Sequence, residues 1–130
     1  MSQSEKFSIS KRIKSFKYAF NGLRIAVKEE HNMRIQLIAI IVVISAGLYF
    51  EISGMEWVTL VLVMGFVVSM EIMNSSIENV CDFISPEKHE LIKKVKDLAA
   101  AAVLISALSA LIVGLIIFVP KVLNIFFLVI

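Results

Sequence analysis

The sequence predicts an all-α integral membrane protein, in which an amphipathic surface helix precedes three transmembrane helices. Of its 130 residues, 58% are hydrophobic and 18% are charged, whereas soluble domains have about 45–50% apolar and 25% charged residues. The apolar residues form long runs, and the charges collect between those runs. The length predicts a single domain over residues 1–130.

Residues 7–30 are expected to form the amphipathic helix. Their apolar side chains recur at alternating steps of four and three residues, and most Lys and Arg residues fall elsewhere around the helix. The apolar positions are Ile9, Ile13, Phe16, Phe20, Leu23 and Val27. A basic helix of this kind lies flat on an anionic membrane face. A signal peptide does not fit, because cations interrupt the apolar stretch.

Three apolar stretches are expected to cross the membrane. The first covers residues 33–50, with Arg34 reaching back to the lipid headgroups. The second covers residues 57–80, and the third covers residues 98–119, where Pro120 closes it. The apolar segment 122–130 has three alternative interpretations: a frayed end, a segment lying on the surface, or a re-entrant piece.

The distribution of Lys and Arg predicts the orientation of the spans. Residues 1–34 hold eight Lys and Arg residues, and the connection at 82–97 holds four Lys residues. The connection at 51–56 holds two acids and no base. Because basic segments remain in the cytoplasm, the N-terminus and the 82–97 connection are expected on the cytoplasmic side of a multi-pass membrane protein.

Composition and missing motifs exclude several classes of protein. A net charge of +2 is too small for nucleic-acid binding, so no nucleic-acid partner is expected. A single cysteine allows no disulfide within the chain. The sequence has no phosphate-binding glycine loop, Cys/His zinc cluster or serine nucleophile elbow. Any nucleotide phosphate would therefore be held by lysine and by carboxylate-bound metal.

One face of the second span gathers polar side chains. Glu71, Asn74, Glu78 and Asp82 are separated by three, four and four residues, which places them on the same helix face. Such groups are costly inside a membrane and mark functional sites. Glu71 lies about 21 Å along the helix from Trp57, so we expect it below the cytoplasmic surface and within reach of a lipid headgroup. Asp82 alone is more typical of a solvated helix end.

Two other interpretations of this face are open. Glu71 could serve a small proton-coupled transporter, or the face could join helices in a membrane subunit without catalytic activity. The pair Lys96-Asp97 is expected to open the third helix at the cytoplasmic level, where the ammonium could meet a phosphate. A membrane-anchoring lysine beside an acid that compensates the helix dipole is the alternative.

These residues resemble a motif of the prokaryotic diacylglycerol kinase family, which includes the undecaprenol kinases. Residues 71–82 match the pattern E-x-x-N-S/T-x-I-E-x-x-x-D, which precedes His89-Glu90, Lys96-Asp97 and a run of alanines. Upstream, residues 18–23 (YAFNGL) also match. The resemblance covers roughly residues 11–119.

The resemblance implies a bacterial inner-membrane lipid kinase that uses ATP and Mg²⁺ and forms a homotrimer with sites between subunits. It implies that Glu71 is the general base for the lipid hydroxyl. Glu30 and Glu78 would bind the Mg²⁺ that accompanies ATP, and Asn74 would orient the base or the substrate.

Further matching positions are implied to face the nucleotide. Lys96 would contact the transferred phosphoryl group and Asp97 would help to hold the nucleotide, while Tyr18, Glu87 and His89 match nucleotide-facing positions. Residues 32–36 (NMRIQ) are closer to the N-x-R-I-H pattern of the undecaprenol branch than to the diacylglycerol branch. The acceptor is therefore expected to be either diacylglycerol or undecaprenol.

Overall fold

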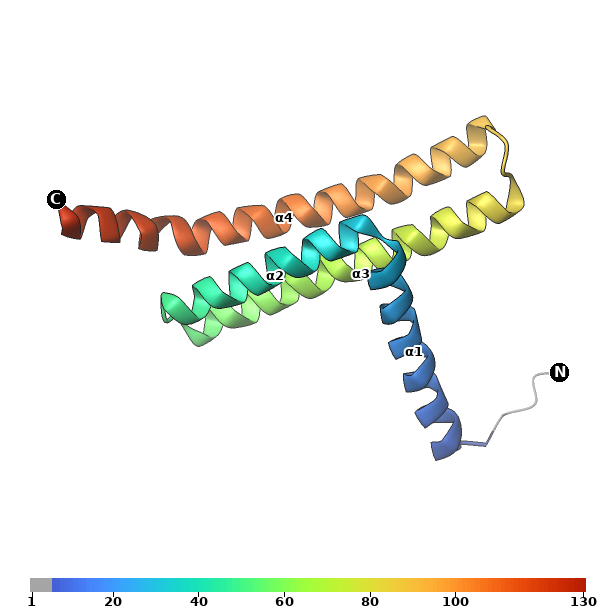
Figure 1. Ribbon diagram of the computed structural model, residues 1–130, viewed down its shortest axis with the longest axis horizontal. Helices are drawn as coiled ribbons and strands as arrows, with labels where there is room; N and C mark the ends of the chain where they lie inside the picture. The colour runs from blue at the N-terminus through green and yellow to red at the C-terminus, as the bar shows by residue number, and fades with distance from the viewer. Residues whose placement is uncertain (1–5) are drawn as a thin grey trace.

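The computed structural model describes residues 6–130, which form four helices. They are α1 (Ile9–Glu29), α2 (His31–Tyr49), α3 (Gly54–Ile84) and α4 (Glu90–Val129). Helices α2, α3 and α4 run side by side, and α1 projects away from them (Figure 1). These three helices are long and apolar enough to cross a membrane, which confirms the predicted all-α class with three potential spans.

Helix α1 meets α2 at Glu30, whose extended backbone interrupts the helical path. The Arg34 guanidinium donates to the carbonyl oxygens of Val27, at 2.9 Å, and of Lys28. The last carbonyls of a helix lack partners within it, so Arg34 caps the end of α1. Its contact with the lipid headgroups stays a prediction. The apolar positions of α1 are exposed, among them Phe20 at 68%, and their contact with a membrane stays a prediction.

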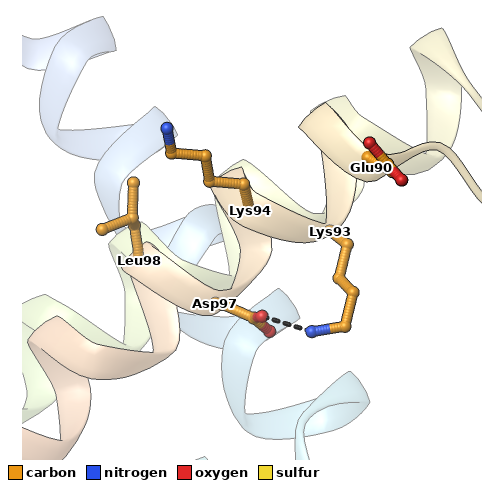
Figure 2. Close-up of a pocket in the computed structure, with 5 residues that line it drawn as sticks. All are labelled: Glu90, Lys93, Lys94, Asp97 and Leu98. Carbon is orange, nitrogen blue, oxygen red and sulfur yellow. Dashed lines mark hydrogen bonds and ion pairs between the residues drawn. The ribbon is translucent and has the colours of Figure 1, made fainter.

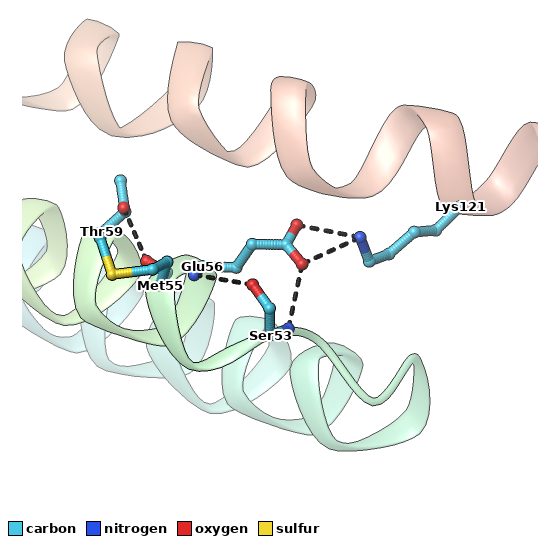
Figure 3. Close-up of polar contacts among 5 residues, drawn as sticks. All are labelled: Ser53, Met55, Glu56, Thr59 and Lys121. Carbon is cyan, nitrogen blue, oxygen red and sulfur yellow. Dashed lines mark hydrogen bonds and ion pairs between the residues drawn. The ribbon is translucent and has the colours of Figure 1, made fainter.

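Helix α3 begins three residues earlier than the predicted span because a capping box forms at its start. Ser53 Oγ accepts from the Glu56 backbone N–H at 3.2 Å, while Glu56 Oε1 accepts from the Ser53 N–H at 3.0 Å (Figure 3). The Glu56 carboxylate also accepts from Lys121 Nζ at 2.9 Å, which joins the start of α3 to α4. Ile52, Leu60 and Ile117 form a buried apolar cluster at this end of the bundle.

Helix α4 is longer than the predicted third span at both ends. It begins at Glu90, where His89 Nδ1 accepts from the Leu91 N–H at 3.1 Å. The α3–α4 connection is therefore shorter than 82–97. The prediction that Lys96-Asp97 opens this helix is wrong, because local capping by His89 starts the helix about two turns earlier.

The prediction that Pro120 closes this helix is also wrong. A proline removes one backbone hydrogen bond inside a helix. Contacts with α3 hold α4 on both sides of Pro120: Ile117 is buried, and Lys121 pairs with Glu56. The helical path consequently continues to Val129.

Candidate functional site

A cavity of about 420 Å³ lies between α2, α3 and α4. Its polar lining side chains are Asn32, Gln36, Glu71, Asn74 and Glu78. Three of the four residues of the predicted polar face therefore line one cavity, as their helical spacing requires. The fourth residue, Asp82, lies one turn further along α3.

Glu71 is the most deeply buried carboxylate in this cavity, with an exposed fraction of 2%. Gln36 of α2 donates from Nε2 to Glu71 Oε2 at 3.2 Å. A buried carboxylate without a donor would carry a large desolvation cost, and the Gln36 amide offsets part of that cost. The hydrogen bond also fixes the orientation of the carboxylate within the cavity.

Two further oxygens in the cavity have unused hydrogen-bonding capacity. Gln36 Oε1 and Asn74 Oδ1 are buried and accept no hydrogen bond from any described residue. Buried polar atoms in folded proteins nearly always have a partner. Both oxygens are acceptors, so the partner that fits them is a donor, such as a hydroxyl group or a metal-bound water.

Glu30 reaches the same region from the corner between α1 and α2. Its Oε1 accepts from Ser75 Oγ at 2.5 Å, and Ser75 lies on α3 between Glu71 and Glu78. This hydrogen bond ties the α1–α2 corner to the polar face of α3. It places Glu30 beside the stretch of α3 that carries Glu78, the other predicted metal ligand.

The donor atoms in this region fit a metal ion that arrives with a nucleotide. The described residues contain no group of three or more His, Cys, Asp and Glu side chains able to hold a metal alone. Mg²⁺ usually binds through one or two carboxylates together with waters and substrate phosphates. Glu30 and Glu78 could supply two such carboxylates, and the Asn74 oxygen, which has no partner among the described residues, could accept from a coordinated water.

A second cavity, of about 550 Å³, lies at the α3–α4 connection and contains most of the predicted nucleotide-facing residues. Its charged and imidazole-bearing lining includes Asp82, Glu87, His89, Lys96 and Asp97. This cavity follows the first one along the same two helices, since Glu78 and Asp82 are one turn apart on α3. The acidic face and the predicted nucleotide-facing residues therefore follow one another along α3 and α4.

Two of the predicted nucleotide-facing residues, Lys96 and Asp97, are engaged in ion pairs. Lys96 Nζ lies 2.6 Å from Asp82 Oδ1 and joins α4 to α3. Asp97 pairs with Lys93 along α4 at 2.5 Å (Figure 2). The side chains of the Lys93–Asp97 pair are 77% and 63% exposed. Exposed ion pairs contribute little to stability, so separating the two side chains of this pair would cost little free energy.

Tyr18 lies apart from the other predicted site residues. It lies on α1 with an exposed fraction of 71%, and among the described residues it lines neither cavity. The sequence pattern did not predict the contacts of Gln36 and Ser75, whose side chains donate hydrogen bonds to the carboxylates of Glu71 and Glu30. The signal for Gln36 was available, because it is an amide inside an otherwise apolar run.

Comparisons with known proteins identify the family of the chain. The prokaryotic diacylglycerol kinase family matches residues 17–118. The chain is 34% identical to the undecaprenol kinase of Bacillus subtilis over 120 residues, which cover 92% of this chain and 98% of that protein. It is 35% identical to the diacylglycerol kinase of Escherichia coli K12 over 100 residues, covering 77% and 82% of the two chains.

A third relative is the diacylglycerol kinase of Helicobacter pylori 26695, at 37% identity over 107 residues that cover 76% of this chain and 83% of that one. These matches confirm the resemblance based on residues 71–82 and the enzyme class that it implied, a phosphotransferase acting on an alcohol. The chain belongs to the prokaryotic diacylglycerol kinase family.

Proposed function

We propose that this protein is an ATP- and Mg²⁺-dependent lipid kinase, which transfers the terminal phosphoryl group of ATP to the hydroxyl of a membrane lipid. The acceptor is diacylglycerol or undecaprenol, the two lipids named in its relatives. The observation that carries this proposal is the burial of Glu71 in a cavity that also contains two unpartnered acceptor oxygens.

Glu71 is the proposed general base. A general base must lie within hydrogen-bond reach of the proton that it removes. Gln36 holds one carboxylate oxygen of Glu71, and the other oxygen has no partner among the described residues. A lipid hydroxyl that enters the cavity could donate to that second oxygen. Asn74 Oδ1, one turn along α3, is placed to orient the hydroxyl or a neighbouring water.

The nucleotide would occupy the second cavity and approach Glu71 along the α3–α4 groove. Glu30 and Glu78 would hold Mg²⁺, whose chemical contribution is to neutralise charge on the phosphates. Lys96 would exchange Asp82 for the transferred phosphoryl group, while Asp97 would help to hold the nucleotide. Glu87 and His89 line this cavity, and Tyr18 is proposed to reach the nucleotide from α1.

We place the protein in the bacterial inner membrane, with its N-terminus and the site on the cytoplasmic side. The basic residues of α1 and of residues 82–97 support this orientation. We further propose a homotrimer. Three packed helices cannot surround ATP, a metal ion and a lipid headgroup at once. In a site between subunits, the neighbouring subunit would supply the remaining contacts.

The test of the proposed function is phosphorylation by the purified protein in lipid, with labelled ATP, Mg²⁺ and both acceptors side by side. We expect label in a lipid product that disappears when Mg²⁺ is chelated. Glu71→Gln keeps the size of the side chain and should lower turnover by about a hundredfold to ten thousandfold while leaving the protein folded. Full activity in this variant would remove the assigned base, and proton uptake without lipid product would support a transporter instead.

A further inference from the structure

Two ion pairs between α3 and α4 mark the two ends of the part of the bundle that spans the membrane. Lys96 pairs with Asp82 at one end, and Lys121 pairs with Glu56 at the other. The two lysines are 25 residues apart in α4, which corresponds to about 38 Å of helix. A bilayer including its headgroups is about 40–45 Å thick, so both pairs fall at the headgroup level.

Helix α4 continues beyond the second of these levels. Phe118 contacts Phe50 with 6.1 Å between ring centroids, and Phe50 lies in the turn between α2 and α3. The residues after Lys121 therefore pass the ends of both neighbouring helices. The last turns of α4 visibly extend past the α2–α3 turn (Figure 1). At 1.5 Å per residue, the segment 122–130 adds about 14 Å beyond the ion pair.

The segment 122–130 has no charged residue, and Asn124 is its one polar side chain. All of its residues are exposed, and exposure is highest furthest from the bundle: 48% at Leu123, 75% at Phe127 and 86% at Leu128. A helix that is apolar on every side is stable only when it is buried or in contact with lipid. A straight continuation of α4 into water would leave all of this surface hydrated.

We propose that the segment 122–130 lies in the interfacial region of the bilayer, at the end of the bundle opposite the polar cavity. This membrane contact would be additional to the one predicted for α1. Lipid fits better than a second copy of this chain, because a helix–helix contact uses one apolar stripe with polar residues on the opposite side. The segment 122–130 has no such polar side. Pro120 lies two residues before its first residue, and a proline inside a helix is a common cause of a bend.

The proposal predicts the depth of individual residues of α4 in a bilayer. In a Cys81→Ser background, a single cysteine would be placed at Phe127 and labelled with a fluorophore. A second variant at Leu128 repeats the measurement. The labelled full chain is reconstituted in phosphatidylcholine vesicles whose lipids carry nitroxide quenchers either at the headgroup or deep in the acyl chain. Matched controls carry the label at Ile112, in the middle of α4, and at Glu51, in the α2–α3 turn.

We expect the labels at 127 and 128 within about 10 Å of the headgroup boundary, quenched most strongly by the shallow nitroxide. The Ile112 label should lie deeper, and the Glu51 label should be quenched by aqueous iodide. Iodide quenching at 127 equal to that at Glu51 would overturn the proposal. Protection from both quenchers, with excimer formation between pyrene labels at 127, would assign the segment to a second copy and overturn it as well.

Discussion

At the scale of single residues, the proposed chemistry depends on Glu71 and on the amide that orients it. Gln36 is joined to Glu71 at 3.2 Å, and its own oxygen accepts no hydrogen bond from the described residues. The Gln36 side chain therefore orients Glu71, the proposed base, and presents its own oxygen to the cavity as an acceptor. Gln36 touches the base and is placed to touch the substrate, so its replacement should affect turnover more than folding.

Replacing Gln36 by Leu should lower kcat by about tenfold to a hundredfold, because a hydrogen bond to a charged group contributes about 1.5–3 kcal/mol. Gln36→His keeps a donor and should retain more of the activity. The matched control is Ser69→Ala, which removes a hydroxyl bonded to the Gly65 carbonyl in the same membrane region of α3. Steady-state kinetics of lipid phosphorylation measure both effects. Equal activity of Gln36→Leu and Ser69→Ala would contradict the role of Gln36.

A glycine at the other end of the bundle is required for packing. A Cβ atom on Gly47 would lie 2.6 Å from Trp57 Cη2, a distance that forces the indole or the helix to move. We expect Gly47→Ala to lower the stability of the fold by about 1–3 kcal/mol, the usual cost of overpacking. Gly114→Ala is the control, since its Cβ would meet no atom within 4 Å. Thermal unfolding in detergent should show a lower Tm for the first variant alone.

At the scale of helices, the sequence predicts which segments are helical better than it predicts where they end. Long apolar runs are enough to identify α2, α3 and α4, because a membrane span requires such runs. The ends depend on particular caps: Ser53 with Glu56 starts α3, and His89 starts α4. Pro120 does not end α4, because tertiary contacts with α3 outweigh a local helix breaker.

The site shows the same division between local pattern and tertiary contact. The helical period alone places Glu71, Asn74 and Glu78 together, and the structure has them in one cavity. The partners that come from other helices do not follow from any spacing. The hydrogen bonds of Gln36 to Glu71 and of Ser75 to Glu30 join residues 35 and 45 positions apart, and they exist because α2 and the α1–α2 corner pack against α3.

The capping box of α3 should contribute measurably to stability. Ser53→Ala leaves the Glu56 N–H without its side-chain acceptor and should cost about 1 kcal/mol. Ser8→Ala is the matched control: Ser8 also caps a helix, but its bond to the Lys11 N–H is long, at 3.5 Å, and α1 projects away from the bundle. Denaturation followed by circular dichroism should therefore separate the two variants. An equal effect of both would show that α3 does not depend on this cap.

At the scale of the whole molecule, the proposed site and the buried apolar cluster lie toward opposite ends of the bundle. The end beside Glu30 and Lys96 carries the two polar cavities, the exposed ion pair of Lys93 and Asp97, and the proposed Mg²⁺ ligands. The other end carries the apolar cluster around Leu60 and the pair between Glu56 and Lys121. Substitutions at the two ends should therefore change different measurements, and this difference can separate a kinase from a merely structural membrane subunit.

Glu78→Gln is the substitution that makes this separation. It removes a charge from the proposed Mg²⁺ site and keeps the shape of the side chain, so the half-saturating Mg²⁺ concentration for lipid phosphorylation should rise at least about tenfold. Glu51→Gln, in the α2–α3 turn, removes a charge at the opposite end and should leave the Mg²⁺ requirement unchanged. Size-exclusion chromatography in detergent should give the same elution for both variants, because neither carboxylate is proposed to hold subunits together. If Glu78→Gln loses the oligomer while its Mg²⁺ requirement is unchanged, Glu78 serves helix association. Replacement of a metal ligand would instead change the Mg²⁺ dependence before it changed assembly.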